Sequence, residues 1–314
     1  YSALSTEDTG QKSVAIGTNA LRNLNFDGDG LNTAIGNDAG RQLISGNQNT
    51  LIGGQTGDAL TTGQYNVALG TYALTNEDTG SRAVAIGFGA LAAQNYDGSS
   101  YNVAVGYDAG NDLTTGIQNT LIGGLSGDAL ETGGNNVAVG YNSLTATTVG
   151  SDNVAVGKDA LESNVNGSAS IAIGSLALED QAPSGTGNIY NIAIGHHAGK
   201  EITTGTNNTL IGGLTGDALT TGGSNVAIGY GALQALDYAG QGYNVAVGYE
   251  AGKALDTGTV NTLIGGLAGD ALVQGNSNVA IGHQALTTEV AGDRSVAIGL
   301  NALRYQTSIY CRCI

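Results

Sequence analysis

One five-residue phrase, typified by residues 136–140 (Asn-Val-Ala-Val-Gly), recurs along the whole of this 314-residue sequence. Successive copies are 17 residues apart in twelve steps, 19 in three steps and 21 in one. A short, fixed period is typical of stacked structural units, each of which contacts only its neighbours. We therefore expect a repeat fold rather than one globular core. The seventeen copies end at Gly17, Gly36, Gly53, Gly70, Gly87, Gly106, Gly123, Gly140, Gly157, Gly174, Gly195, Gly212, Gly229, Gly248, Gly265, Gly282 and Gly299.

The phrase has the residue types of a short β-strand. The residue three places before the glycine is always Val, Ile or Thr, and β-branched residues favour extended backbone. Successive strand residues point to opposite faces, so Val137 and Val139 share one face and Ala138 takes the other. Both faces are apolar, which is typical of parallel strands covered on both sides. We expect the small Ala column to face a neighbouring chain, which it would allow to approach closely.

These patterns predict an all-β fold, a parallel β-solenoid of about 18 rungs with a 17-residue repeat. Residues 1–310 would form a single repeat domain, and residues 311–314 a tail. The sequence starts in the middle of a repeat, so we interpret it as a fragment of a longer fibre. We expect Cys311 and Cys313 to be unpaired tail residues, although a Cys-x-Cys pair is also compatible with metal binding or cross-linking.

Asparagine stands four residues before the glycine in thirteen copies. An Asn side chain donates and accepts hydrogen bonds at once, so the column predicts a ladder of amides at one turn of the coil. We assign structural roles to Asn66, Asn102, Asn136, Asn153, Asn225, Asn278, Gly70, Gly140 and Gly229.

The second half of each repeat alternates between two patterns. The residue four places after the glycine is Leu in nine copies and Gly in eight, and all eight Gly copies have Leu or Ile three places later. We interpret this as one interior slot filled from two alternative backbone paths, because a close-packed interior tolerates no empty slot.

The net charge of −16 argues against nucleic acid and anionic membranes as partners. We expect no membrane insertion, no cofactor and no enzymatic activity, because the three His residues form no recognisable catalytic set. The Gly-Asp-Ala-Leu aspartates (Asp58, Asp128, Asp217 and Asp270) are interpreted as solvated or turn-capping rather than metal-binding. His196 and His197 should point to opposite faces, which disfavours a metal site there.

Four connections are longer than the others, and all precede the Asn column: residues 25–31, 95–101, 183–190 and 237–243. Loops on a rigid scaffold commonly carry recognition, and aromatic rings give large contact areas. We therefore place a receptor-binding site, with a glycan as one possible ligand, on these connections. The alternative is that each aromatic ring folds back on its own rung, which we favour for Tyr101, Tyr190 and Tyr243. The predicted binding residues are Phe26, Asp27, Asp29, Tyr96, Asp97, Tyr190, Tyr238 and Tyr243.

Two further patterns leave alternatives open. The segment 27–30 (Asp-Gly-Asp-Gly) faintly resembles a calcium loop, but it lacks the distal Glu of an EF-hand. The residue after the repeat glycine is often aromatic, as at Phe88, Tyr107, Tyr141, Tyr230 and Tyr249. We favour aromatic packing along a stacked column there over a strip that stacks on carbohydrate.

The phrases at residues 13–17 (Ser-Val-Ala-Ile-Gly) and 278–282 (Asn-Val-Ala-Ile-Gly) resemble the head repeats of YadA-type trimeric autotransporter adhesins. The fuller phrase Asn-Thr-Leu-Ile-Gly-Gly at residues 208–213 is also similar to repeats in bacteriophage tail-fibre proteins. The resemblance implies a left-handed β-roll, a homotrimer, and an extracellular role in host attachment at a virion surface. The alternative is the head of a bacterial cell-surface adhesin. An enzyme such as a polysaccharide lyase, an ice-binding solenoid and a purely structural filament are weaker alternatives. No functional residue is carried over.

Overall fold

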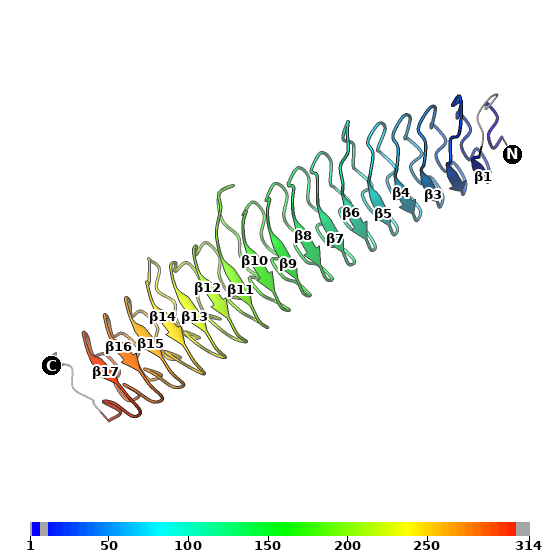
Figure 1. The fold of residues 1–314 in the computed structure, drawn as a ribbon. Coiled ribbons are helices and arrows are strands. Elements are labelled where there is room, and N and C mark those ends of the chain that lie inside the picture. Colours follow the sequence, from blue (N-terminus) through cyan, green and yellow to red (C-terminus); the bar gives the residue numbers. More distant parts are fainter. Residues whose placement is uncertain (1, 7–11, 306–314) are drawn as a thin grey trace. The chain divides into compact units, whose positions relative to one another are not determined.

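The structure, a computed structural model, describes residues 2–6 and 12–305 and is all-β in that range (Figure 1). The seventeen predicted strands are all present, each three residues long, and no helix occurs among the described residues. Each strand coincides with the three residues before a repeat glycine, so the predicted parallel β-solenoid is confirmed. The chain forms two compact units, Tyr1–Asn153 and Val154–Ile314. Both units consist of rungs of the same type, each with one three-residue strand.

The strands of the first unit are β1 (Val14–Ile16), β2 (Thr33–Ile35), β3 (Thr50–Ile52), β4 (Val67–Leu69), β5 (Val84–Ile86), β6 (Val103–Val105), β7 (Thr120–Ile122) and β8 (Val137–Val139). Those of the second are β9 (Val154–Val156), β10 (Ile171–Ile173), β11 (Ile192–Ile194), β12 (Thr209–Ile211), β13 (Val226–Ile228), β14 (Val245–Val247), β15 (Thr262–Ile264), β16 (Val279–Ile281) and β17 (Val296–Ile298).

Within each unit, every strand pairs in parallel with the next, and equivalent repeat positions lie opposite each other. Ala85 pairs with Ala104 across a 19-residue step, and Ile171 pairs with Ile192 across the 21-residue step. The extra residues therefore do not disturb the sheet. They leave the coil as the longer connections, which emerge on the same side of each unit (Figure 1).

The Ala column faces the interior of its own coil, which contradicts our expectation. Ala138 is completely buried within the single chain, whereas Val137 and Val139, on the opposite strand face, are partly exposed. The coil is narrow, so the small side chain is needed inside and the larger β-branched side chains point outward. The two apolar faces were predicted correctly, but they were assigned the wrong way round.

The interpretation of one interior slot filled by two paths is also wrong. In the rung of Gly17, Leu21 and Leu24 are both fully buried, so the fourth and seventh positions after the glycine are separate interior columns. A Cβ on Gly40 would lie 2.7 Å from Cδ1 of Leu51, a residue of β3. The space left by the glycine is thus filled by the strand leucine of the following rung. This leucine replaces the usual alanine in β3, β7, β12 and β15.

Left-handed turns close every rung. The repeat glycines have φ between 122° and 148°, and non-glycine residues adopt φ near +50° to +60° at recurring positions, as at Leu21, Asn135 and Leu144. Such residues cost roughly 1–2 kcal/mol each in isolation. They persist here because their backbone groups bond to adjacent rungs, as when the Leu125 N–H donates to the Tyr107 carbonyl at 2.9 Å.

Candidate functional site

The long connections present their aromatic residues in two ways. Tyr101, Tyr190 and Tyr243 are 55%, 56% and 59% exposed, so the expectation that these three fold back over their own rungs is wrong. All three occupy the left-handed position that precedes the Asn column, with φ of 50° to 56°. This backbone conformation directs the side chain away from the coil.

The other three aromatic residues do fold back. The rings of Phe26, Tyr96 and Tyr238 each lie against the glycine two residues later, where a Cβ would be 3.8, 3.0 and 2.7 Å from ring carbons. The rings therefore brace the connections that carry them. In the connection at 95–101 the Gly98 N–H also donates to the Tyr96 carbonyl at 2.6 Å, and the Gly98 carbonyl accepts from the Ser81 N–H at 2.7 Å. This connection is a tight, ordered turn.

A hollow of about 460 Å³ opens beside this turn and spans three consecutive rungs of the first unit. Two of its lining residues, Tyr96 and Asp97, are predicted binding residues, whereas the other three were not singled out. The Thr79 hydroxyl holds the Asp97 carboxylate with a 2.7 Å hydrogen bond. Asp78 Oδ1 is shielded from solvent and accepts no hydrogen bond from the described protein. The hollow is lined by Asp78, Asn95, Tyr96, Asp97 and Thr115.

A buried polar network lies next to the hollow. The Glu77 carboxylate accepts hydrogen bonds from the Gly80 N–H at 2.7 Å, the Gln94 side chain at 3.0 Å and the Tyr96 N–H at 3.3 Å. Burial raises the pKa of the Glu77 carboxyl above its ordinary value, the three hydrogen bonds oppose that rise, and the charge of Asp78 adds to it. Glu77 thus links the interior of its rung to the backbone of Tyr96, the aromatic residue that lines the hollow.

Beside the same connection, Arg82 lies between two tyrosines of the adjacent rungs. Its guanidinium carbon is 5.0 Å from the Tyr65 ring centroid and 5.8 Å from that of Tyr101. Cations over aromatic faces within about 6 Å are attracted to the ring quadrupole. The exposed Tyr101 ring is therefore held in place by its neighbours.

The remaining predicted binding residues lie on the other long connections. Asp29 forms an exposed ion pair with Lys12 at 2.7 Å. The Tyr190 hydroxyl accepts a hydrogen bond from the Asn188 amide at 2.7 Å. Phe26, Asp27, Tyr238 and Tyr243 stay as predictions for their own connections.

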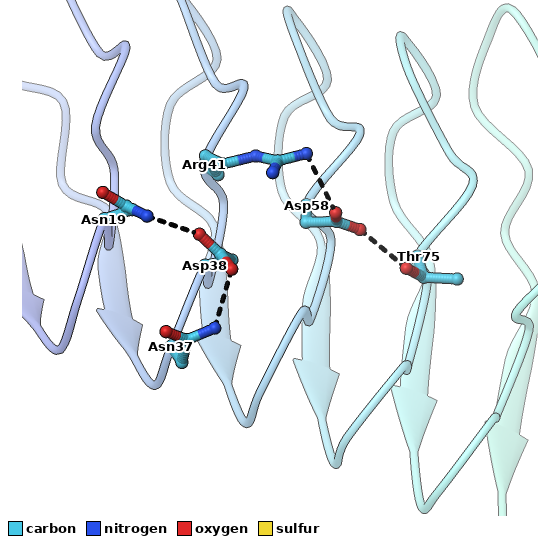
Figure 2. A network of polar contacts seen from close by, with 6 residues as sticks. All are labelled: Asn19, Asn37, Asp38, Arg41, Asp58 and Thr75. Carbon is cyan, nitrogen blue, oxygen red and sulfur yellow. Dashed lines mark hydrogen bonds and ion pairs between the residues drawn. The ribbon is translucent and has the colours of Figure 1, made fainter.

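The Gly-Asp-Ala-Leu aspartates belong to polar ladders along the stack (Figure 2). Asp58 accepts a 2.6 Å hydrogen bond from the Thr75 hydroxyl on the following rung and forms a 3.5 Å ion pair with Arg41 on the preceding rung. A parallel ladder joins Asn19 to Asp38 at 2.9 Å. Burial raises the pKa of the Asp128 carboxyl above its ordinary value, and the Thr145 hydrogen bond opposes that rise. The expectation that these aspartates are solvated is therefore wrong, because they are partly buried and contact neighbouring rungs.

The Asn side chains form a buried ladder with two kinds of contact. Asn136 Nδ2 donates to Asn119 Oδ1 at 3.1 Å and to the Gly150 carbonyl at 2.9 Å, while Asn136 Oδ1 accepts from the Asn153 N–H at 3.0 Å. Asn66 and Asn102 make the same kind of contact in the first unit, and Asn225 and Asn278 make it in the second. Each amide therefore joins the preceding rung to the following one.

Two residues that sequence reasoning missed repair breaks in this ladder. Alanine replaces asparagine at residue 83, and the Gln94 side-chain carbonyl of that rung accepts the Asn102 amide at 2.9 Å instead. Serine replaces asparagine at residue 170, and Gln181 accepts the Asn191 amide at 2.9 Å. The signal was available in the sequence, because both glutamines stand seven places after the glycine in the very rungs that lack the asparagine.

The aromatic residues that follow the repeat glycines stack along the coil, as our favoured interpretation predicts. Phe88 and Tyr107 have ring centroids 5.7 Å apart, and Tyr230 and Tyr249 are 5.8 Å apart, with nearly parallel planes in both pairs. A ring also lies over the second glycine of Leu-Ile-Gly-Gly, as Tyr141 does at Gly124. That glycine leaves room for the aromatic ring of the next rung.

The rings of His196 and His197 are stacked 4.0 Å apart, so the expectation of opposite faces is wrong. Both residues follow the end of β11 and lie in its turn, where strand alternation no longer applies. Within residues 2–6 and 12–305, no group of three or more His, Cys, Asp or Glu residues is placed to hold a metal ion, and no helix has the length and hydrophobicity to cross a membrane. Cys311 and Cys313 lie outside the described residues. No protein-family model matches the chain, and a search of curated proteins likewise gives no match.

Proposed function

We propose that this chain is a structural and adhesive segment of an extracellular fibre, namely part of a bacteriophage tail-fibre shaft that takes part in host attachment. The fold supports a structural role, because the buried side chains of each rung pack against, or form hydrogen bonds with, the neighbouring rungs. The repeat phrases that resemble those of tail fibres and YadA-type heads favour this function over an enzymatic one.

The observation that carries the proposal is the apolar outward face of the sheet. Each strand presents two β-branched or aliphatic side chains there, and several are more than a third exposed within the single chain. Monomeric soluble proteins seldom expose long contiguous apolar surfaces, and such surfaces mark interaction sites. The exposed members are Val14, Ile16, Leu69, Ile122, Ile173, Ile194, Ile228, Ile264, Val296 and Ile298.

Other copies of the same chain are the partners that best fit this face. The face repeats with the period of the rungs, so an identical coil offers a matching periodicity along the whole contact. The face itself is made of apolar strand residues, so the net charge of −16 does not oppose close approach at the strands. Three such chains, each with its strands turned inward, would form a homotrimer.

The long connections support the attachment role. They leave the coil without altering the sheet register, so they can vary in sequence while the rungs keep their packing. We place the contact with the host-surface receptor there, and a glycan is the ligand class that the exposed tyrosines fit.

Light scattering on the purified chain tests the assembly. We expect the mass of a trimer, and a variant with Val105→Lys, Ile122→Lys and Val139→Lys on the outward face should dissociate while it keeps its β circular-dichroism spectrum. Gln118→Lys is the matched control, because Gln118 is exposed at a position that holds Lys12 and Arg82 in other rungs. A wild-type chain that stays folded as a monomer at micromolar concentration would contradict the proposal.

A further inference from the structure

We propose that the hollow lined by Asp78, Asn95, Tyr96, Asp97 and Thr115 binds one neutral hexopyranose unit of a glycan. This inference rests on the proposed function for its biological meaning, because it names the ligand class that one connection would recognise. The binding itself requires only the first unit of the chain, which contains the whole hollow.

The chemistry of the lining matches that of a sugar. A pyranose has an apolar face of C–H groups and a rim of hydroxyls, and Tyr96 offers an aromatic surface that is braced against Gly98. Aromatic rings with one polar end suit such amphipathic ligands. Around Tyr96, the Asp78 and Asp97 carboxylates accept hydrogen bonds, while the Asn95 amide and the Thr115 hydroxyl both donate and accept. A concave site with a few convergent polar groups is typical of small-molecule recognition.

One acceptor in the hollow has no partner in the protein. Asp78 Oδ1 is shielded from solvent and accepts no hydrogen bond from the described residues. A buried acceptor without a partner is unfavourable. A rotation of the Asp78 side chain that brings this oxygen to the surface of the hollow would let a sugar hydroxyl donate to it, and the new hydrogen bond would remove the penalty.

The charge of the hollow selects against acidic sugars. Asp78 and Asp97 line it, and neither forms an ion pair with a Lys or Arg among the described residues. Like charges brought together at a poorly solvated surface repel each other, so sialic acid, uronates and sulfated sugars should be excluded. The ligand class is therefore a neutral hexose or N-acetylhexosamine.

The chain carries its own comparison in the connection at 237–243. Tyr238 corresponds to Tyr96 and also lies against a glycine, but Ala239 stands where the first connection has Asp97. Thr220 stands at the position equivalent to Asp78, and Asp237 stands where the first connection has Asn95. This connection therefore keeps the aromatic ring but has a counterpart of neither carboxylate of the hollow, so the sugar site proposed for the first connection is not repeated there.

Saturation-transfer NMR on the full chain, with methyl glycosides of glucose, galactose, mannose and N-acetylglucosamine as probes, tests the inference. We expect transfer to at least one of these glycosides and none to sialic acid or methyl glucuronide. Tyr96→Ala should weaken binding by at least about tenfold, which corresponds to about 1.4 kcal/mol. Asp97→Asn, which keeps the shape of the side chain, should also weaken binding. Asp152→Asn, at an exposed carboxylate outside the connections, should leave it unchanged.

The outcomes separate this inference from the proposed function. Absence of transfer to every neutral glycoside would overturn the sugar site, as would equal loss of binding in Asp97→Asn and Asp152→Asn. Binding of Ca²⁺ that is abolished by Asp97→Asn, without sugar binding, would also overturn it and identify a cation site. If neutral sugar binds as described but host attachment is unchanged in Tyr96→Ala, the sugar site stands and its role in attachment fails.

Discussion

The side-chain carbonyl of Gln94 accepts a 2.9 Å hydrogen bond from the amide of Asn102, across the rung in which alanine takes the place of asparagine. The Gln94 amide in turn donates to Glu77 at 3.0 Å. Gln94 thus replaces the acceptor that the missing asparagine would offer to the Asn102 amide, and its own amide donates to Glu77 instead. We predict that Gln94→Leu lowers the free energy of unfolding by about 1–3 kcal/mol, because buried polar partners lose their hydrogen bonds. Urea unfolding followed by circular dichroism measures this change.

A rescue variant provides the control for that prediction. The rung of Gly229 carries asparagine at residue 225 and leucine at residue 236, and Asn244 donates to Asn225 Oδ1 at 3.2 Å. Combining Ala83→Asn with Gln94→Leu reproduces this pairing and should recover part of the lost stability. Double-mutant cycles measure such coupling between neighbouring residues. Purely additive losses would show that Gln94 does not replace the asparagine.

Replacing Asn136 tests the ladder where it is intact. Asn136→Leu removes the donors to Asn119 and Gly150 and the acceptor for the Asn153 N–H, so we predict a loss of about 1–3 kcal/mol in the free energy of unfolding. Asn135→Gln is the matched control, because Asn135 is exposed and glutamine occupies the same repeat position at residue 118. Equal stability of the two variants in urea titrations would contradict a structural role for the ladder.

Two glycines of adjacent rungs, Gly70 directly after β4 and Gly54 two residues after β3, should respond differently to alanine. Gly70 has φ of +139°, and a Cβ there would lie 2.3 Å from the Gly87 carbonyl oxygen, so Gly70→Ala should cost about 3 kcal/mol or more. Gly54 has no such φ, and the nearest atom to its added Cβ is 4.0 Å away. Gly54→Ala should therefore change stability by less than about 1 kcal/mol. Thermal unfolding of both variants compares them directly.

The stability contributed by Glu77 should depend on pH. Burial raises the pKa of this carboxyl in the folded state above its ordinary value of 4.5, so over that window the folded chain binds more protons than the unfolded chain. The free energy of unfolding then decreases as pH rises above 4.5 and levels off beyond the raised pKa, with a slope of up to about 1.4 kcal/mol per pH unit.

Glu77→Gln cannot ionise, so the difference in stability between this variant and wild type should shift in favour of the variant as pH rises through that window. Urea titrations at several pH values between 4 and 8 measure the difference (about the range in which carboxyl groups with raised pKa values titrate). A difference that is constant with pH would show that the Glu77 pKa is not raised. Asp152→Asn, at an exposed carboxylate of the same unit, is the matched control.

The fold was predictable from the sequence because the repeat phrase fixes the strand, its length and its register at once. Each position of the repeat is seen seventeen times, so its preferred residue types are clear. The parallel pairing then follows from the regular spacing of the strands. The direction in which Ala138 points was not predictable in this way. Alternation separates two faces, but the width of the coil decides which face is inside, and that width depends on left-handed turns at residues such as Leu144 that no propensity indicates.

The candidate site was predictable only in part. Tyr96 and Asp97 were found because they stand in an inserted segment with turn residues. Asp78 and Thr115 line the same hollow but belong to regular rungs on either side, so their sequence context resembles that of many other turn residues. Only the stacking of three rungs brings them together.

The asparagine ladder gives each unit a direction. Every Oδ1 in it accepts from the following rung and every amide donates toward the preceding one or to its own coil, as Asn261 and Asn278 show at 3.0 Å. If a rung were added in the opposite orientation, its Asn amide would face another amide instead of a side-chain oxygen. Only rungs added in the same orientation therefore continue the ladder. Duplication of one complete 17-residue repeat keeps every hydrogen bond between adjacent asparagines. Loss of part of a repeat instead breaks the hydrogen bonds of that rung with both the preceding and the following rung. The length of such a coil is thus free to evolve in whole steps while its polarity stays fixed.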